Sequence, residues 1–152
     1  MARSTNGHAQ EAQVADGASR LAGIHVLVVD DDEDARGLFA TALHHSGATV
    51  ATADSTRAAL EAMRLAQPDV LLADISMPER DGYDLIAAVR MAHGPRPTAI
   101  AVSAHARKED RERALAAGYD DYVTKPVDPA HLAAVIARLL GRGRRAPLVA
   151  SA

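Results

Sequence analysis

The fold is decided by one stretch of the sequence, Val70-Leu71-Leu72-Ala73-Asp74-Ile75-Ser76-Met77-Pro78-Glu79-Arg80-Asp81-Gly82. An apolar run leads to Asp74, and the chain then breaks into a loop that contains proline and glycine. A short, continuously apolar run of this kind predicts a strand that is buried on both faces of a sheet. The carboxylate of Asp74 would then lie at the rim of the sheet, where the strand ends.

Two other places in the chain repeat this layout. The pair Asp30-Asp31 follows the apolar run 26–29, and the pair Lys125-Pro126 follows residues 122–124. Ligands of open α/β sheets bind outside the carboxyl ends of the strands, where these side chains would converge. The sequence therefore predicts one site at this edge, formed by the three carboxylates and the ammonium group of Lys125.

Apolar runs alternate with amphipathic stretches along the chain, and this alternation predicts an α/β fold. Strands are expected at residues 24–29, 49–53, 70–73, 98–103 and 121–123. Helices are expected at residues 33–45, 55–66, 83–91, 108–117 and 129–140. Five strands that alternate with five helices form a (βα)5 chain. Right-handed crossovers then favour a doubly wound five-stranded parallel sheet with helices on both faces. The pattern alone leaves the strand order open, and 2-1-3-4-5 is one of two common solutions.

Two of these helices show which side they bury. The stripe expected to face the core in the first helix consists of Ala35, Leu38, Phe39 and Ala42. In the last helix it consists of Leu132, Val135, Ile136 and Leu139. Residues 1–22 and 142–152 have little periodicity, so we expect a disordered N-terminal tail, a domain over 23–141 and a flexible C-terminal tail.

Composition excludes several classes of function. The chain has 152 residues, of which 48% are hydrophobic and only 3% aromatic, so one domain with a core of Ala, Val, Leu and Ile is expected. A net charge of -3 with dispersed Lys and Arg argues against a nucleic-acid partner. The absence of cysteine, of a secretory signal and of a long apolar run predicts a soluble, cytoplasmic protein with no membrane partner.

The predicted cluster of acids indicates phosphoryl chemistry. Neighbouring carboxylates repel one another, and a divalent cation removes that cost. Oxygen ligands favour Mg²⁺, which takes one or two carboxylates together with phosphate oxygens. Asp74 could act as a nucleophile toward phosphorus, while Asp30 and Asp31 position the metal. Lys125 and Ser103, which ends the fourth strand, would bind the phosphoryl oxygens.

Each of these residues also has a simpler interpretation. The acids from Asp30 to Asp34 could form an ordinary acidic helix start, and Asp74 could be another helix cap. Lys125-Pro126 could be an ordinary loop, and Ser103 a strand-end hydroxyl. The functional interpretation is favoured because these groups follow different strands in an order that brings them to one edge.

From about residue 24 to residue 141, the chain resembles the receiver domain of bacterial two-component response regulators. The resemblance is carried by four segments: Val26-Leu27-Val28-Val29-Asp30-Asp31, Val70 to Gly82 as quoted above, Ala101-Val102-Ser103-Ala104 and Tyr122-Val123-Thr124-Lys125-Pro126. It implies a flavodoxin-like, chemotaxis-regulator-like fold with the strand order 2-1-3-4-5.

The resemblance also implies a role for each site residue. Asp74 would accept a phosphoryl group from a phosphohistidine of a histidine kinase or a phosphotransfer protein. Mg²⁺ would be held by Asp31, Asp74 and the backbone carbonyl of Ser76, with Asp30 acting largely through a bound water. Ser103 and Lys125 would bind the phosphoryl group, and the Lys125–Pro126 bond would be cis.

Three positions bear on switching and lifetime. Tyr122 occupies the position whose ring swings inward when the serine moves toward phosphate, so Ser103 and Tyr122 would form the switch. Ser76 stands where many relatives have Asn or another larger residue, which affects access for water. His105 lies near the mouth of the pocket, so Ser76 and His105 are candidate rate-tuning residues.

The leading functional interpretation is a single-domain response regulator, a phosphoacceptor switch rather than an enzyme. It would signal through the face formed by residues 108–117, 121–123 and 129–140, to an unidentified downstream protein or in a homodimer. An alternative is the receiver of a hybrid histidine kinase or phosphorelay. An aspartyl-nucleophile phosphatase is disfavoured, because such enzymes place a second Asp at the position of Ser76.

Overall fold

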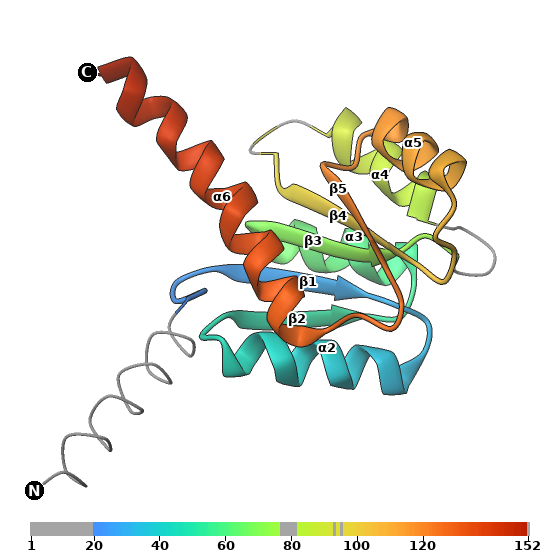
Figure 1. The fold of residues 1–152 in the computed structure, drawn as a ribbon. Helices are drawn as coiled ribbons and strands as arrows, with labels where there is room; N and C mark the ends of the chain where they lie inside the picture. The colour runs from blue at the N-terminus through green and yellow to red at the C-terminus, as the bar shows by residue number, and fades with distance from the viewer. Residues whose placement is uncertain (1–19, 77–81, 93, 95, 152) are drawn as a thin grey trace, which may run out of the picture.

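The computed structural model describes residues 20–76, 82–92, 94 and 96–151, with residues 142–151 described by their backbone alone. Five parallel strands form one sheet in the order β2-β1-β3-β4-β5 (Figure 1). The strands are β1 (His25–Val29), β2 (Thr49–Ala53), β3 (Val70–Asp74), β4 (Thr98–Ser103) and β5 (Asp121–Thr124). The structure thus confirms the (βα)5 fold and supplies the strand order that the pattern left open.

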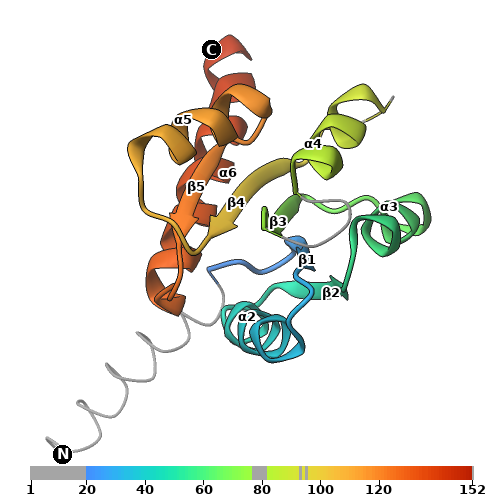
Figure 2. The same cartoon turned by 90° about the vertical axis from the view of Figure 1, so that its right-hand side faces the viewer.

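The helices cover both faces of the sheet, as predicted (Figures 1 and 2). They are α2 (Glu33–His45), α3 (Thr56–Leu65), α4 (Gly82–Met91), α5 (Lys108–Ala117) and α6 (Pro129–Ser151). Helices α2 and α6 share one apolar core with one face of the sheet. Helices α3, α4 and α5 share a second core with the other face.

The register of the strands explains why their polar ends meet. Val29 lies opposite Ala53 on one side and Ala73 on the other, and Ala73 lies opposite Ala101. The residues that follow Val29 and Ala73 therefore emerge at one level of the sheet. Strands β1, β3 and β4 are almost entirely buried, which suits their continuous apolar sequences.

Local signals fix the starts of two helices. The side chain of Asp32 accepts a hydrogen bond from the backbone N–H of Asp34 at the start of α2. The hydroxyl of Ser55 accepts one from the N–H of Ala58 at the start of α3. An N-cap of this kind satisfies a donor that the helix leaves free, and it is typically worth about 1 kcal/mol.

The predicted core stripe of α2 was wrong at one position. Leu38 is 74% exposed, whereas Leu43, which the spacing argument did not select, is 1% exposed. Phe39 packs against the core from a partly buried position. At about 100° per residue, Leu38 and Leu43 lie about 140° apart on opposite edges of the predicted stripe, and α2 packs with its Leu43 edge toward the sheet. In α6 the expected Leu132, Val135 and Ile136 are buried.

The ends of the domain also differ from expectation. Leu21, assigned to the N-terminal tail, is fully buried, and its N–H donates to the carbonyl of Ser46. The last helix continues to Ser151 instead of ending at residue 140. A glycine such as Gly141 costs a helix interior only about 1 kcal/mol, so it does not by itself end one.

The rest of the expected N-terminal tail, residues 1–19, lies outside the described residues, as does the segment 77–81 after the third strand. In the part of the chain that was searched, no helix is long and apolar enough to cross a membrane.

Candidate functional site

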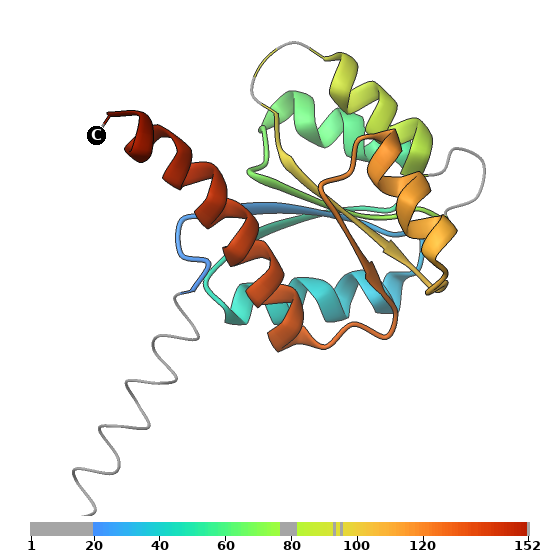
Figure 3. The ribbon, with the colours of Figure 1, turned by 45° about the horizontal axis from the view of Figure 1, so that its top comes forward.

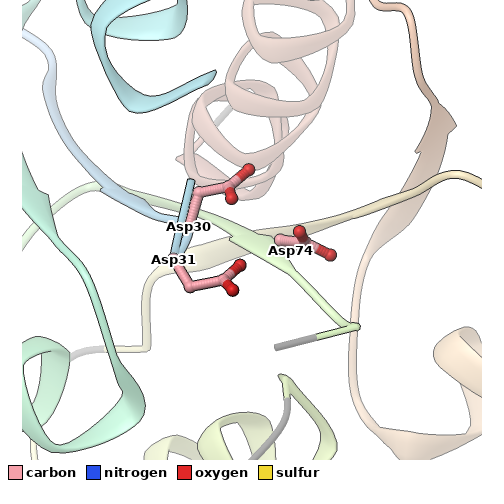
Figure 4. A group of neighbouring side chains, drawn as sticks. All are labelled: Asp30, Asp31 and Asp74. Carbon is pink, nitrogen blue, oxygen red and sulfur yellow. The ribbon is translucent and has the colours of Figure 1, made fainter. Parts of the chain in front are cut away.

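Three carboxylates from two strand ends come together at the edge of the sheet (Figure 4). Asp30 and Asp31 follow β1, and Asp74 is the last residue of β3. One carboxylate oxygen from each lies within 4.8 Å of the others. Asp30 and Asp74 are 1% and 7% exposed, while Asp31 is exposed to solvent. The site is therefore a buried pair of acids with a third acid at its mouth.

Backbone hydrogen bonds fix the orientation of the two buried acids. The N–H of Asp32 donates to Oδ1 of Asp30 at 2.9 Å, and the N–H of Ser76 donates to Oδ1 of Asp74 at 2.8 Å. Each acid thus binds the backbone two residues further on, as Asp does when it stabilises a turn. The Arg36 guanidinium, one turn into α2, donates to the carbonyl of Asp30 at 2.8 Å. These backbone contacts engage Oδ1 of each acid and leave Oδ2 of each for a partner outside the loop.

Lys125, just after β5, bridges these acids. Its Nζ lies 2.9 Å from Oδ2 of Asp30 and 3.2 Å from Oδ2 of Asp74. Burial alone would lower the pKa of Lys125, but the hydrogen bond to Asp30 and the charge of Asp74 outweigh it and raise the pKa above its ordinary value. The ammonium group is therefore charged throughout the neutral range. The Lys125–Pro126 bond is cis, as the resemblance implied.

The donor set suits a hard divalent cation. Three carboxylates outnumber the ammonium group of Lys125, so the cluster has an excess of negative charge when ionised. All the clustered ligands are carboxylate oxygens, and Mg²⁺ prefers oxygen to nitrogen or sulfur. The residues present therefore fit Mg²⁺, and Asp30, Asp31 and Asp74 are the candidates to hold it. The Ser76 carbonyl as a further ligand stays a prediction.

Ser103 and Tyr122 are linked through the backbone of His105. Ser103 is 1% exposed, and its hydroxyl accepts a hydrogen bond from the N–H of His105 at 3.0 Å. The Tyr122 ring is buried, and its hydroxyl donates to the carbonyl of His105. His105 is exposed to solvent. A movement of the Ser103 hydroxyl would therefore displace the backbone of His105, to which Tyr122 is also bound.

A family model describes this combination of residues. The model for the response regulator receiver domain matches residues 26–137 of the chain. This match spans well over half of the sequence and includes Asp30, Asp31, Asp74, Ser103 and Lys125. The chain belongs to the response regulator receiver domain family. Receiver domains are phosphoacceptor modules of two-component systems, and Mg²⁺ and a phosphorylated Asp are typical of them.

Relatives and solved structures agree with this assignment. The receiver is 46% identical over 113 residues to an uncharacterised 14.6 kDa protein of Leptolyngbya boryana, covering 74% of this chain and 86% of that protein. It is 39% identical over 117 residues to the transcriptional regulatory protein PrrA of Mycobacterium tuberculosis, covering 77% of this chain and 50% of PrrA. The chain therefore spans half the length of that regulator.

The receiver domain of the Francisella response regulator 1452 superposes on this receiver with a TM-score of 0.73 and 30% identity. The alignment covers 80% of this chain and 99% of the Francisella chain.

Sequence reasoning missed two groups of contacts. Arg36 was not singled out, although its position six residues after Asp30 places it one turn into a helix that starts beside the site. Asp121 was treated only as a strand residue. It is 8% exposed and forms salt bridges with Arg111 of α5 at 3.3 Å and Arg138 of α6 at 3.1 Å. A charged residue within an otherwise buried strand was the available signal, because such a residue needs partners.

Proposed function

We propose that Asp74 accepts a phosphoryl group from a phosphohistidine on a histidine kinase or a phosphotransfer protein. The observation that carries the proposal is the place of Asp74 on β3, the strand between β1 and β4. On one side of it lie the carboxylates of Asp30 and Asp31, and on the other side lies β4, which ends in Ser103. Intact mass spectrometry after exposure to acetyl phosphate and Mg²⁺ tests this proposal, the expected product carrying one labile phosphoryl group.

The geometry suits direct transfer to the carboxylate. A carboxylate oxygen of Asp74 would attack phosphorus, so that an O–P bond forms while the P–N bond to the donor imidazole breaks and the nitrogen keeps the electron pair. Bound Mg²⁺ would neutralise charge on the phosphoryl oxygens. Lys125 already contacts Asp74 and can bind a phosphoryl oxygen on that side. The hydroxyl of Ser103 can donate to another oxygen once it turns away from the His105 N–H.

This chemistry makes the protein a switch rather than a turnover enzyme, since the product remains attached to Asp74. Rate tuning by Ser76 and His105, a cytoplasmic location and the lack of nucleic-acid and membrane partners stay predictions from the sequence.

A protein donor would need a surface to bind beside Asp74. A hollow of about 540 Å³ lies between α2 and the start of α6, and its lining includes Lys125, Leu38 and Pro126. Leu38 also lines a second hollow that extends along α2 to His45. Leu38 and Pro126 are both exposed and line the first hollow together beside Lys125, and an exposed apolar patch marks a site of protein contact. We infer that the donor protein covers Leu38 when its imidazole reaches the site.

Leu38→Glu is therefore expected to slow transfer from the protein donor at least about tenfold, because a charge replaces an apolar contact that would be buried in the complex. The measurement is the transfer rate from whichever histidine kinase of the host labels the wild type fastest. Labelling by acetyl phosphate should be unchanged, because that donor needs no protein surface.

Leu65→Glu is the matched control, since Leu65 is 82% exposed on α3, on the other face of the sheet. Equal transfer rates for the two variants would show that the donor binds elsewhere.

The output surface follows from the link between Ser103 and Tyr122. When Ser103 releases the N–H of His105, the carbonyl of the same residue, which accepts from Tyr122, is displaced as well. Tyr122 is adjacent to Asp121, which is paired with Arg111 of α5 and Arg138 of α6. Phosphorylation would therefore alter the face formed by α5, β5 and α6, which could bind a downstream protein or a second copy of the chain.

Beryllofluoride with Mg²⁺, a stand-in for the phosphoryl group, is expected to shift amide resonances across α5, β5 and the start of α6 as well as in the loops that touch the ligand. Two-dimensional amide spectra measure this. In Tyr122→Phe, which lacks the hydroxyl that binds the His105 carbonyl, the shifts should shrink toward the ligand loops. Wild-type shifts confined to those loops would rule out this output face.

A further inference from the structure

The backbone of the chain closes on itself just after the acceptor residue. Ile75 follows Asp74, and Gly82 is the first residue of α4. A Cβ atom placed on Gly82 would lie 2.6 Å from the Cα of Ile75 and 2.9 Å from the hydroxyl oxygen of Tyr119. Both distances are too short for a real side chain. Ile75 and Gly82 therefore form a closed neck in which backbone packs directly against backbone, with Tyr119 at its side.

Tyr119 holds this neck through a hydrogen bond. Its side chain is 3% exposed, and its hydroxyl donates to the carbonyl of Gly82 at 2.6 Å. The two residues are 37 positions apart, so the bond ties the turn between α5 and β5 to the beginning of α4. A buried bond of this kind is costly to lose, because the carbonyl that remains has no access to water.

The turn that carries Tyr119 is itself firmly anchored. Arg90, in the last turn of α4, donates to the carbonyl of Gly118 from Nη2 at 2.8 Å and from Nε at 2.9 Å. Its Nη2 also lies 3.1 Å from the carboxylate of Asp120, which in turn accepts from the N–H of Ala99 in β4 at 2.8 Å. The residues on both sides of Tyr119 are thus fixed to α4 and to the sheet.

The turn between α5 and β5 therefore forms hydrogen bonds with both ends of α4. Tyr119 binds the first residue of α4, and the residues beside Tyr119 are bound by Arg90 from its last turn. Figure 3 shows α4 and α5 side by side on the same face of the sheet. A further contact joins them, since the Arg113 guanidinium of α5 lies 4.3 Å from the centre of the Tyr83 ring of α4. The position of the Tyr119 hydroxyl is therefore restrained, and its hydrogen bond restrains Gly82 in turn.

We propose that Tyr119 is a positioning residue for the cation site. The neck residue Ile75 is directly between Asp74 and Ser76, and the N–H of Ser76 orients Oδ1 of Asp74. Holding Ile75 against Gly82 therefore fixes the carboxylate of Asp74 and the backbone that follows it. The inference rests on the proposed function, because it concerns how tightly the same acids hold Mg²⁺.

Tyr119→Phe tests the proposal, because it keeps the ring and removes only the hydroxyl. The dissociation constant for Mg²⁺, measured by titration of the amide resonances of the full chain, is expected to rise about three- to tenfold. This is below the ~10–100-fold typical when a direct partner of a metal ligand is removed, since Tyr119 acts one step further away. Hydrogen exchange at the amide of Ser76 should become faster.

Ile136→Val controls for a loss of stability without a change at the neck. Ile136 is fully buried in the core on the other face of the sheet, so trimming it destabilises the fold by leaving a void. Its Mg²⁺ affinity should equal that of the wild type. Gly82→Ala is a second variant, in which the new methyl group pushes Ile75 and the Tyr119 hydroxyl away from residue 82. It is expected to weaken Mg²⁺ binding more than Tyr119→Phe does.

The outcomes separate the two proposals. A wild type that does not bind Mg²⁺ at the acids would overturn the proposed function and the role of Tyr119 together. A wild type that binds Mg²⁺, with Tyr119→Phe of equal affinity, would overturn the role of Tyr119 alone. Equal losses of affinity in Tyr119→Phe and Ile136→Val would do the same, because the effect would then follow stability and not the neck.

Discussion

Replacing Asp74 by alanine is expected to abolish phosphorylation by acetyl phosphate and Mg²⁺. Alanine has no oxygen that could attack phosphorus, so the loss should exceed the detection range of intact mass spectrometry, at least about a hundredfold. The fold should survive, because the substitution removes a buried charge and leaves β3 otherwise intact. Removing this acid also takes away one of the two partners of Lys125, whose ammonium group keeps its contact with Asp30.

Asp54→Ala is the matched control for this experiment. Asp54 also follows a strand directly, since β2 ends at Ala53, but it is not among the clustered acids. This variant should be labelled as fast as the wild type. Retention of the full label in Asp74→Ala would move the acceptor to another residue, and peptide mapping after borohydride reduction would then locate it.

The second large effect is expected from Asp31→Asn. Asp31 is the exposed member of the acid cluster, while Lys125 contacts the other two members. The amide of Asn carries no charge, so the Mg²⁺ dissociation constant should rise. Losing a residue that only hydrogen-bonds to a metal ligand typically weakens metal binding ~10–100-fold, and loss of a ligand's own charge should cost at least as much. At subsaturating Mg²⁺ the rate of phosphorylation should fall in proportion, and higher Mg²⁺ should restore part of it.

The same substitution should act in the opposite direction on the metal-free fold. Without a cation the three carboxylates repel one another, so removing one charge should raise the melting temperature measured in EDTA. Asp32→Asn is the control, because Asp32 is adjacent and acidic but lies outside the cluster. A Mg²⁺ affinity that Asp31→Asn leaves unchanged would place the ion away from these acids.

The elements of the fold could be predicted from the sequence because their signals are local. Helices α2 and α5 and strands β2 and β4 begin and end where the pattern placed them. A continuous apolar run marks a buried strand, and a capping side chain such as that of Ser55 marks the start of a helix. These signals lie within a few residues of the element that they define.

The acid site was predictable for a related reason. Parallel strands present all their carboxyl ends at one edge, so strand-end residues such as Asp30 and Asp74 must be neighbours if their strands are. The pattern could not say that they are, since the strand order was open without the family resemblance. The sheet order β2-β1-β3-β4-β5 places β1 next to β3 and brings these acids together.

The sequence by itself determined the strands, most helix bounds and the chemical character of the site, because these depend on residues close together in the chain. The tertiary structure alone decided the contact between Lys125 and Asp30, which are 95 positions apart, and the bond from Tyr119 to Gly82 across 37 positions. It also decided that Leu38 is exposed and Leu43 buried. Such features depend on how helices lie against the sheet and on where crossovers return the chain, and no local pattern encodes either.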